Sequence, residues 1–187
     1  MYSDQELVAK TLKGHKSAFD ELVERYAKKV YNLSLRMTRD PADAEDLTQE
    51  VFLRAYRSLN TYNPAYSFVN WVLKIASNLC IDHLRRKGDV RDDSDELLSL
   101  EVQKTHPDPE SAALYSEQVS EIEKALMSLP PKYQLVMLLL YAEDLKYEQI
   151  AEILDEPIGT VKTKIHRARK ILKERFFSER EKDTKKA

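Results

Sequence analysis

Long stretches of this chain contain no residue that ends a helix, and this constrains its fold more than any other feature. Glycine occurs three times and proline seven times in 187 residues. These two residues are the strongest helix breakers, so their scarcity favours long helices. Apolar residues also recur at helical spacing in several segments. The sequence therefore predicts an all-α fold.

Two helical blocks flank an acidic segment that has no apolar pattern. Residues 89–111 hold eight acidic residues against two basic ones, a net charge of −6, with two prolines near the end. This composition favours a solvated, flexible linker. We therefore expect two small helical domains, at 1–88 and 112–176, joined by the acidic linker and followed by a frayed tail, 177–187.

The apolar spacing also predicts the individual helices. Asp40 and Pro41 form a good helix start, because the first side chain caps the helix and the second fits its first position. That helix is expected to end near Leu59. The other expected helices span 3–13, 17–38, 68–86, 112–128, 131–142, 147–155 and 159–176.

The strongest pattern is a helix-turn-helix that starts at Tyr147. A short apolar helix is followed by a break at Asp155–Pro157 and by a second helix with its own apolar stripe. Such a pair places its second helix in the major groove of DNA. The second helix, 158–175, carries seven basic residues against one acidic residue, a net charge of +6. The side chains expected to reach base edges are Thr160, Lys162, Thr163, Lys164, His166 and Arg167.

Two further patterns lie in the first domain. Asp43, Asp46 and Glu50 form an acidic stripe with Gln49 beside it. The helix dipole explains the first acid but not Glu50, so a docking face for a basic partner is at least as good an interpretation.

The second pattern is a group of aromatic residues. Six of the sixteen aromatic residues fall within 52–71, with cations and amides interleaved or following. Aromatic and basic groups together suit single-stranded DNA, whereas a core role is expected for Phe52, Phe68 and Trp71. Tyr62 and Tyr66, near Pro64, are the better candidates for exposed contacts. Asn70, Lys74 and Asn78 are expected on one face, opposite the apolar stripe.

The chain resembles bacterial RNA polymerase sigma factors of the extracytoplasmic-function (ECF) type. The resemblance rests on three segments in this order: DAEDLTQEVFLRAY (43–56), FVNWVLKIASNLCIDHLRR (68–86) and LPPKYQLVMLLLYAEDLKYEQIAEILDEPIGTVKTKIHRARKIL (129–172). It implies promoter-specific initiation with core RNA polymerase and control by an anti-sigma factor. The chain departs from the family at two places. Family members often have a Ser-Thr-Trp-Leu run where this chain has Phe68-Val69-Asn70-Trp71-Val72, and often have a glycine in the helix-turn-helix turn where this chain has Asp155-Glu156.

The resemblance also implies roles for individual residues. The stripe of Asp43, Asp46, Gln49 and Glu50 would dock on the clamp helices of the largest polymerase subunit. The melted minus-ten strand would bind Tyr62, Tyr66, Phe68, Asn70, Lys74 and Asn78. The minus-thirty-five duplex would contact Lys162, Thr163, Lys164, His166 and Arg167.

Other classes of protein fit the sequence less well. It has no glycine-rich phosphate loop, metal-ligand cluster or nucleophile–base signature, so neither an enzyme nor a cofactor is expected. No apolar run approaches a membrane span, and the lone Cys80 is typical of a buried residue in the reducing cytoplasm, where we expect the protein. A stand-alone helix-turn-helix regulator remains an alternative, but it leaves the acidic stripe and the aromatic loop unexplained.

Overall fold

The computed structural model describes residues 2–88 and 125–184, with side chains to Arg175. These parts of the chain form helices and contain no β-strand. The expected linker at 89–111 and most of the expected helix at 112–128 lie outside the described residues. No helix in the described parts has the length and apolar character needed to cross a membrane.

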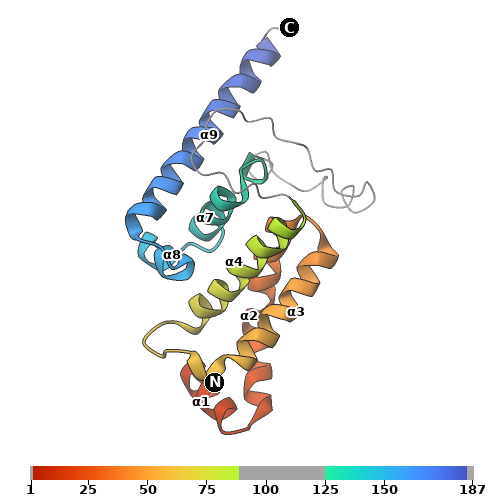
Figure 1. Ribbon diagram of the computed structural model, residues 1–187, viewed down its shortest axis with the longest axis vertical. Helices are drawn as coiled ribbons and strands as arrows, with labels where there is room; N and C mark the ends of the chain where they lie inside the picture. The colour runs from red at the N-terminus through yellow and green to blue at the C-terminus, as the bar shows by residue number, and fades with distance from the viewer. Residues whose placement is uncertain (1, 89–124, 185–187) are drawn as a thin grey trace.

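The first domain has four α-helices, and the other three pack against the second (Figure 1). Helix α3 begins as predicted, because the Asp40 carboxylate accepts hydrogen bonds from the amides of Ala42 (2.8 Å) and Asp43 (3.0 Å) ahead of the first turn. The elements are α1 (Asp4–Leu12), α2 (Lys16–Thr38), α3 (Pro41–Arg57), the 3₁₀ turn η1 (Leu59–Thr61) and α4 (Phe68–Arg86).

The core of this domain follows the apolar stripes of the sequence. Leu22, Val51 and Val72 are fully buried, and Phe68 is 1% exposed. Burial of each such side chain contributes about 1.5–3 kcal/mol, before the entropy cost of ordering it. Cys80 is also buried, and burial raises the pKa of its thiol to about 11. This cysteine is therefore a small core residue, as predicted.

The second domain contains α7 (Pro131–Tyr141), α8 (Tyr147–Leu154) and α9 (Ile158–Thr184). Helix α7 is apolar on nearly every side, and all seven residues from Tyr133 to Leu139 are buried. A helix of this kind must be covered all round. It contacts α8 and α9 in its own domain and α2 and α4 of the first domain.

The turn of the helix-turn-helix forms without glycine. Asp155 ends α8 in the left-handed conformation (φ 55°, ψ 43°), which aspartate tolerates better than most residues. Val161, Ile165 and Ala168 then bury the inner face of α9. This helix continues to Thr184, beyond the end expected near 176.

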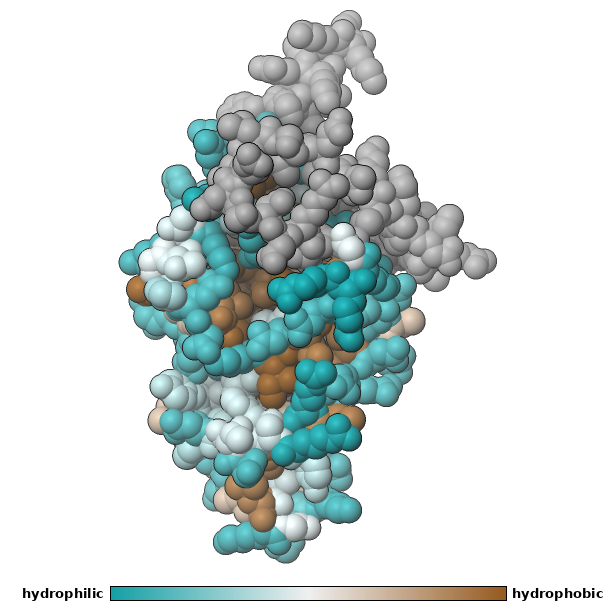
Figure 2. Space-filling view, viewed as in Figure 1, coloured by the Kyte–Doolittle hydropathy of each residue, from teal (hydrophilic) through white to brown (hydrophobic). Residues whose placement is uncertain are grey.

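The two domains are in contact, with α4 beside α7 and α8 (Figure 1). The Gln134 side chain is 2% exposed and donates to the Arg36 carbonyl at 2.6 Å. Ion pairs join Lys29 to Glu143 at 2.7 Å and Lys74 to Asp155 at 3.2 Å. Figure 2 shows the molecule from the same side as Figure 1. Hydrophobic residues gather across the middle of this face, where α4 lies in Figure 1, and hydrophilic residues lie on either side.

Candidate nucleic-acid and polymerase interface

The acidic stripe lies on α3, but its four residues differ in their surroundings. Asp46 and Gln49 are exposed. The carboxylate of Glu50 lies 2.6 Å from the Arg54 side chain, one turn further along the helix. Asp43 faces α4, where Lys87 donates a hydrogen bond to it at 2.5 Å and the His83 Nε2 atom lies 3.1 Å away. The outward-facing part of the stripe therefore centres on Asp46 and Gln49.

The pKa of Asp43 reflects these contacts. Partial burial alone would raise it, but the hydrogen bond from Lys87 and the nearby His83 outweigh burial and hold the pKa below its usual value of 3.8. Asp43 is thus a charged link between α3 and α4, which the sequence did not indicate.

The loop before α4 places one of its two tyrosines inside and the other outside. Tyr66 is 50% exposed, as predicted. The expectation that Tyr62 is exposed was wrong, since only 9% of it is accessible. Its ring packs against Phe68 and Trp71, with centroids 5.6 and 5.5 Å apart, and its hydroxyl donates to the Tyr66 carbonyl at 2.7 Å. Tyr62 therefore shapes the loop from within.

The polar face of α4 is also less accessible than predicted. Asn78 is exposed, but Asn70 is 5% exposed and Ser77 is fully buried. The Asn70 Oδ1 and Ser77 Oγ atoms find no hydrogen-bond partner among the described residues. The expectation that Asn70 faces solvent was wrong because α4 packs against α7 and α8, and Lys74 on the same face reaches Asp155.

Buried polar atoms without partners make this contact costly. Each such atom costs about 1–3 kcal/mol of desolvation that no hydrogen bond recovers. Burial of Asn70 and Ser77 on this side of α4 therefore carries a desolvation cost.

The outer face of α9 presents most of the predicted base-reading side chains. Thr160, Lys162, Thr163 and His166 are exposed. Arg167 and Lys164 are half-buried, and the Lys164 ammonium lies 2.5 Å from the Glu156 carboxylate in the turn. Lys164 therefore also holds the turn to the helix, a role that the sequence did not indicate.

An open hollow of about 450 Å³ lies at the start of α9. Its walls include Thr160, Thr163 and Arg167 from α9 and Lys132 from α7. Lys132 was missed in the sequence because it is a single charged residue in a largely apolar helix, although it follows the Pro130-Pro131 helix start. The hollow brings a further cation to the end of α9 that the sequence predicts to read bases.

No group of three or more His, Cys, Asp or Glu side chains within 2–88 and 125–184 is arranged to hold a metal ion. A basic helix face, a loop with an exposed aromatic residue and an acidic helix face are the features that can bind other macromolecules.

Comparison with known proteins agrees with these features. Two family models match the chain: Sigma-70 region 2 at residues 22–90 and Sigma-70 region 4 at residues 120–172. The ECF RNA polymerase sigma factor SigW of Bacillus subtilis is 36% identical over 176 residues, which is 88% of this chain and 91% of SigW. The ECF RNA polymerase sigma-E factor of Escherichia coli is 33% identical over 178 residues, 91% of this chain and 92% of that protein.

Solved structures share the fold. CnrH, in its complex with the cytosolic domain of CnrY, superposes with a TM-score of 0.69 at 21% identity and covers 94% of this chain and 97% of its own. The sigma factor RpoE of Bartonella quintana, in complex with the anti-sigma factor NepR, gives a TM-score of 0.61 at 20% identity and covers 83% of this chain and 94% of its own.

The chain belongs to the ECF family of RNA polymerase sigma factors. It directs promoter-dependent initiation of transcription by RNA polymerase. This function accounts for the first domain, which a stand-alone regulator leaves unexplained.

Proposed function

We propose that the two domains contact promoter DNA at separate elements while the outer face of α3 docks on core RNA polymerase. The basic outer face of α9 carries this proposal, because its cations and hydroxyls are exposed on a helix whose other side is buried. The chain acts by binding, without catalytic chemistry of its own.

The minus-thirty-five element would be read as duplex DNA by α9. Thr160, Lys162, Thr163 and His166 lie near the start of the helix, where side chains meet base edges in the major groove. Arg167 and Lys164 complete the predicted set, and Lys132 at the hollow adds a cation suited to a backbone phosphate. These positions support recognition of bases at one end of the helix and phosphate contacts around it.

The minus-ten element would be bound as a melted single strand by the loop before α4 and by α4 itself. Tyr66 offers an exposed ring for stacking, and Asn78 offers an exposed amide. Tyr62 and Phe68 support the loop from the core. Asn70 and Lys74 become available once the second domain moves away from α4. Binding to polymerase at two points would favour that separation and would also raise the local concentration of each promoter element.

The clamp helices of the largest polymerase subunit are the proposed partner of α3. Asp46 and Gln49 would make direct contacts. Asp43 and Glu50 lie on the same helix, where their carboxylates pair with Lys87 and Arg54. We also infer an anti-sigma factor as a regulatory partner, because RpoE, which shares this fold, was solved in complex with the anti-sigma factor NepR.

Transcription in vitro with bacterial core polymerase tests the assignment of α9. The template is a promoter library randomised at both elements, with the sigma factor present or absent. The wild-type protein should select one pair of elements. The double substitution Lys162→Ala and His166→Ala should abolish the preference at minus thirty-five and keep that at minus ten.

The matched control is the double substitution Lys28→Ala and His15→Ala, which removes the same residue types from exposed positions of the first domain. It should leave both preferences unchanged. Preservation of the minus-thirty-five preference in the α9 variant would contradict the proposed role of this helix face.

A further inference from the structure

The loop proposed to capture the minus-ten strand is held by contacts that come from within it and from outside it. Inside the loop, the Asn63 carboxamide oxygen accepts from the Ala65 amide at 3.0 Å, and Tyr62 donates to the Tyr66 carbonyl. At its end, the Ser67 hydroxyl accepts from the Asn70 amide at 3.3 Å and begins α4. These bonds shape the loop but do not fix its position on the domain.

A contact from α1 holds the loop in position, in addition to the packing of the Tyr62 ring. The side-chain amide of Gln5 donates to the Pro64 carbonyl at 2.9 Å, across 59 residues of sequence. Helix α1 also packs against η1, immediately before the loop. Gln5 therefore connects the first turn of α1 to Pro64 in the loop.

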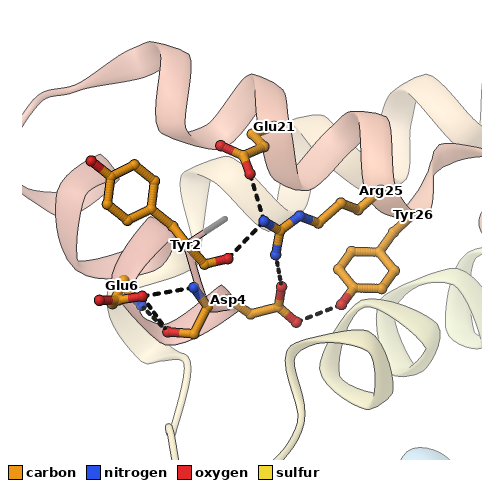
Figure 3. Close-up of polar contacts among 7 residues, drawn as sticks. Tyr2, Asp4, Glu6, Glu21, Arg25 and Tyr26 are labelled. Carbon is orange, nitrogen blue, oxygen red and sulfur yellow. Dashed lines mark hydrogen bonds and ion pairs between the residues drawn. The ribbon is translucent and has the colours of Figure 1, made fainter.

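The first turn of α1 is itself held firmly, as Figure 3 shows. Asp4 accepts hydrogen bonds from Arg25 at 2.8 Å and from the Tyr26 hydroxyl at 2.5 Å. Arg25 also donates to the Tyr2 carbonyl at 2.7 Å, and Ser3 and Glu6 form a reciprocal cap at the helix start. Gln5 thus projects from a turn that α2 holds in place.

The same network reaches the loop by a second route. Burial and the bond to Asp4 raise the pKa of Tyr26 to about 12. The Tyr26 ring packs on Phe68, with centroids 5.8 Å apart, and Phe68 packs on Tyr62. Asp4 therefore supports the buried side of the loop through the rings of Tyr26, Phe68 and Tyr62. Gln5 holds the exposed side of the loop at Pro64.

We propose that Asp4, Gln5 and Tyr26 are positioning residues that set the conformation of loop 62–67 and thereby its discrimination among minus-ten sequences. The proposal rests on the proposed role of this loop in capturing the single strand. None of the three residues needs to touch DNA. A loop held on both its exposed and its buried side presents Tyr66 and its own backbone in one arrangement, and a fixed arrangement favours one base over another.

The test measures initiation by the reconstituted holoenzyme on promoters that differ only in the minus-ten element. Gln5→Glu replaces the donor with a carboxylate that repels the Pro64 carbonyl. Tyr26→Phe removes the bond to Asp4 and keeps the ring on Phe68. Each variant should lose about two- to tenfold of the preference for the best minus-ten element over single-base variants, the range expected for one hydrogen bond.

Ala9→Glu is the control, because it adds the same charge to an exposed position of α1 one turn beyond Gln5. Its minus-ten preference should equal that of the wild type. All variants should keep the wild-type preference at minus thirty-five, which a general loss of folding would not preserve.

An unchanged minus-ten preference in both Gln5→Glu and Tyr26→Phe would overturn the positioning role while leaving the proposed function intact. Absence of any minus-ten preference in the wild-type holoenzyme would instead overturn the assignment of the loop, and the positioning role with it.

Discussion

The ammonium group of Lys74 on α4 lies 3.2 Å from the carboxylate of Asp155, the residue that ends α8. The first belongs to the helix proposed to bind the minus-ten strand, and the second belongs to the turn of the helix-turn-helix. One ion pair thus engages both proposed DNA-binding elements at once, and DNA that binds Lys74 as proposed would compete with Asp155.

Substitution Asp155→Asn is expected to raise the affinity of the free protein for a single-stranded minus-ten oligonucleotide. Asparagine tolerates the left-handed backbone of this position, and the exposed ion pair is worth at most about 1 kcal/mol, or about fivefold in affinity. The gain should shrink at about 0.5 M salt, where screening has weakened the pair. Fluorescence anisotropy measures both effects.

Asp144→Asn is the matched control for this experiment. Asp144 is exposed and also left-handed (φ 52°), and the substitution removes the same charge from the same domain. Equal gains from the two substitutions would show that general charge, rather than the pair with Lys74, is responsible.

Gln134→Glu is expected to separate the domains. The buried side chain would place a carboxylate against the Arg36 carbonyl, and an uncompensated buried charge costs about 3–5 kcal/mol. Small-angle X-ray scattering should therefore show a larger radius of gyration. Gln149→Glu should not change it, because the Gln149 oxygen accepts from the Lys146 amide and a carboxylate accepts equally well. A wild-type radius in Gln134→Glu would mean that this contact does not hold the domains together.

Asp43→Asn is expected to lower the stability of the first domain in a pH-dependent way. A carboxyl group whose pKa is lower in the folded chain than in the unfolded chain stabilises the fold above the unfolded pKa. That stabilisation is lost as the pH falls through the folded pKa, which for Asp43 lies below 3.8. The variant should be about 0.5–1 kcal/mol less stable at pH 7. Urea unfolding should show this difference vanishing well below pH 4, and a constant difference at all pH values would contradict it.

Lys164→Ala and Lys162→Ala are expected to differ in their effect on stability. Lys164 pairs with Glu156, whose Oε2 atom is buried without a partner, so its removal leaves a half-buried carboxylate uncompensated. Thermal unfolding should show a lower Tm for Lys164→Ala and an unchanged Tm for Lys162→Ala, whose side chain is exposed. Both should weaken binding to minus-thirty-five duplex DNA. Equal Tm values for the two variants would limit Lys164 to DNA contact.

The sequence predicted the elements of the fold because local signals agreed with one another. The start of α3 at Pro41 and the full extent of α4 follow from helix capping and apolar spacing. The expected turn after α8 also forms, with Asp155 in place of a glycine. Each of these features depends on residues that are close together in the chain.

The errors at the candidate site have the opposite origin. Tyr62 was expected outside because it lies beside Pro64, yet Phe68 and Trp71 enclose its ring. Asn70 was expected outside because it lies opposite the apolar stripe of its own helix, yet a second domain covers that side. Gln5 was missed because its partner is 59 residues away. A helical period shows which side of a helix is apolar, but not what packs against the polar side.

The bond from Gln134 to Arg36 has a consequence for synthesis of the chain. The two residues are 98 positions apart, so at about 5–20 residues per second the ribosome adds Gln134 roughly 5–20 s after Arg36. Domains generally fold as units during translation, and α4 ends well before α7 begins. Each nascent molecule therefore passes through an interval in which Asn70 and Lys74 are already on a folded helix and α8 has not yet been made.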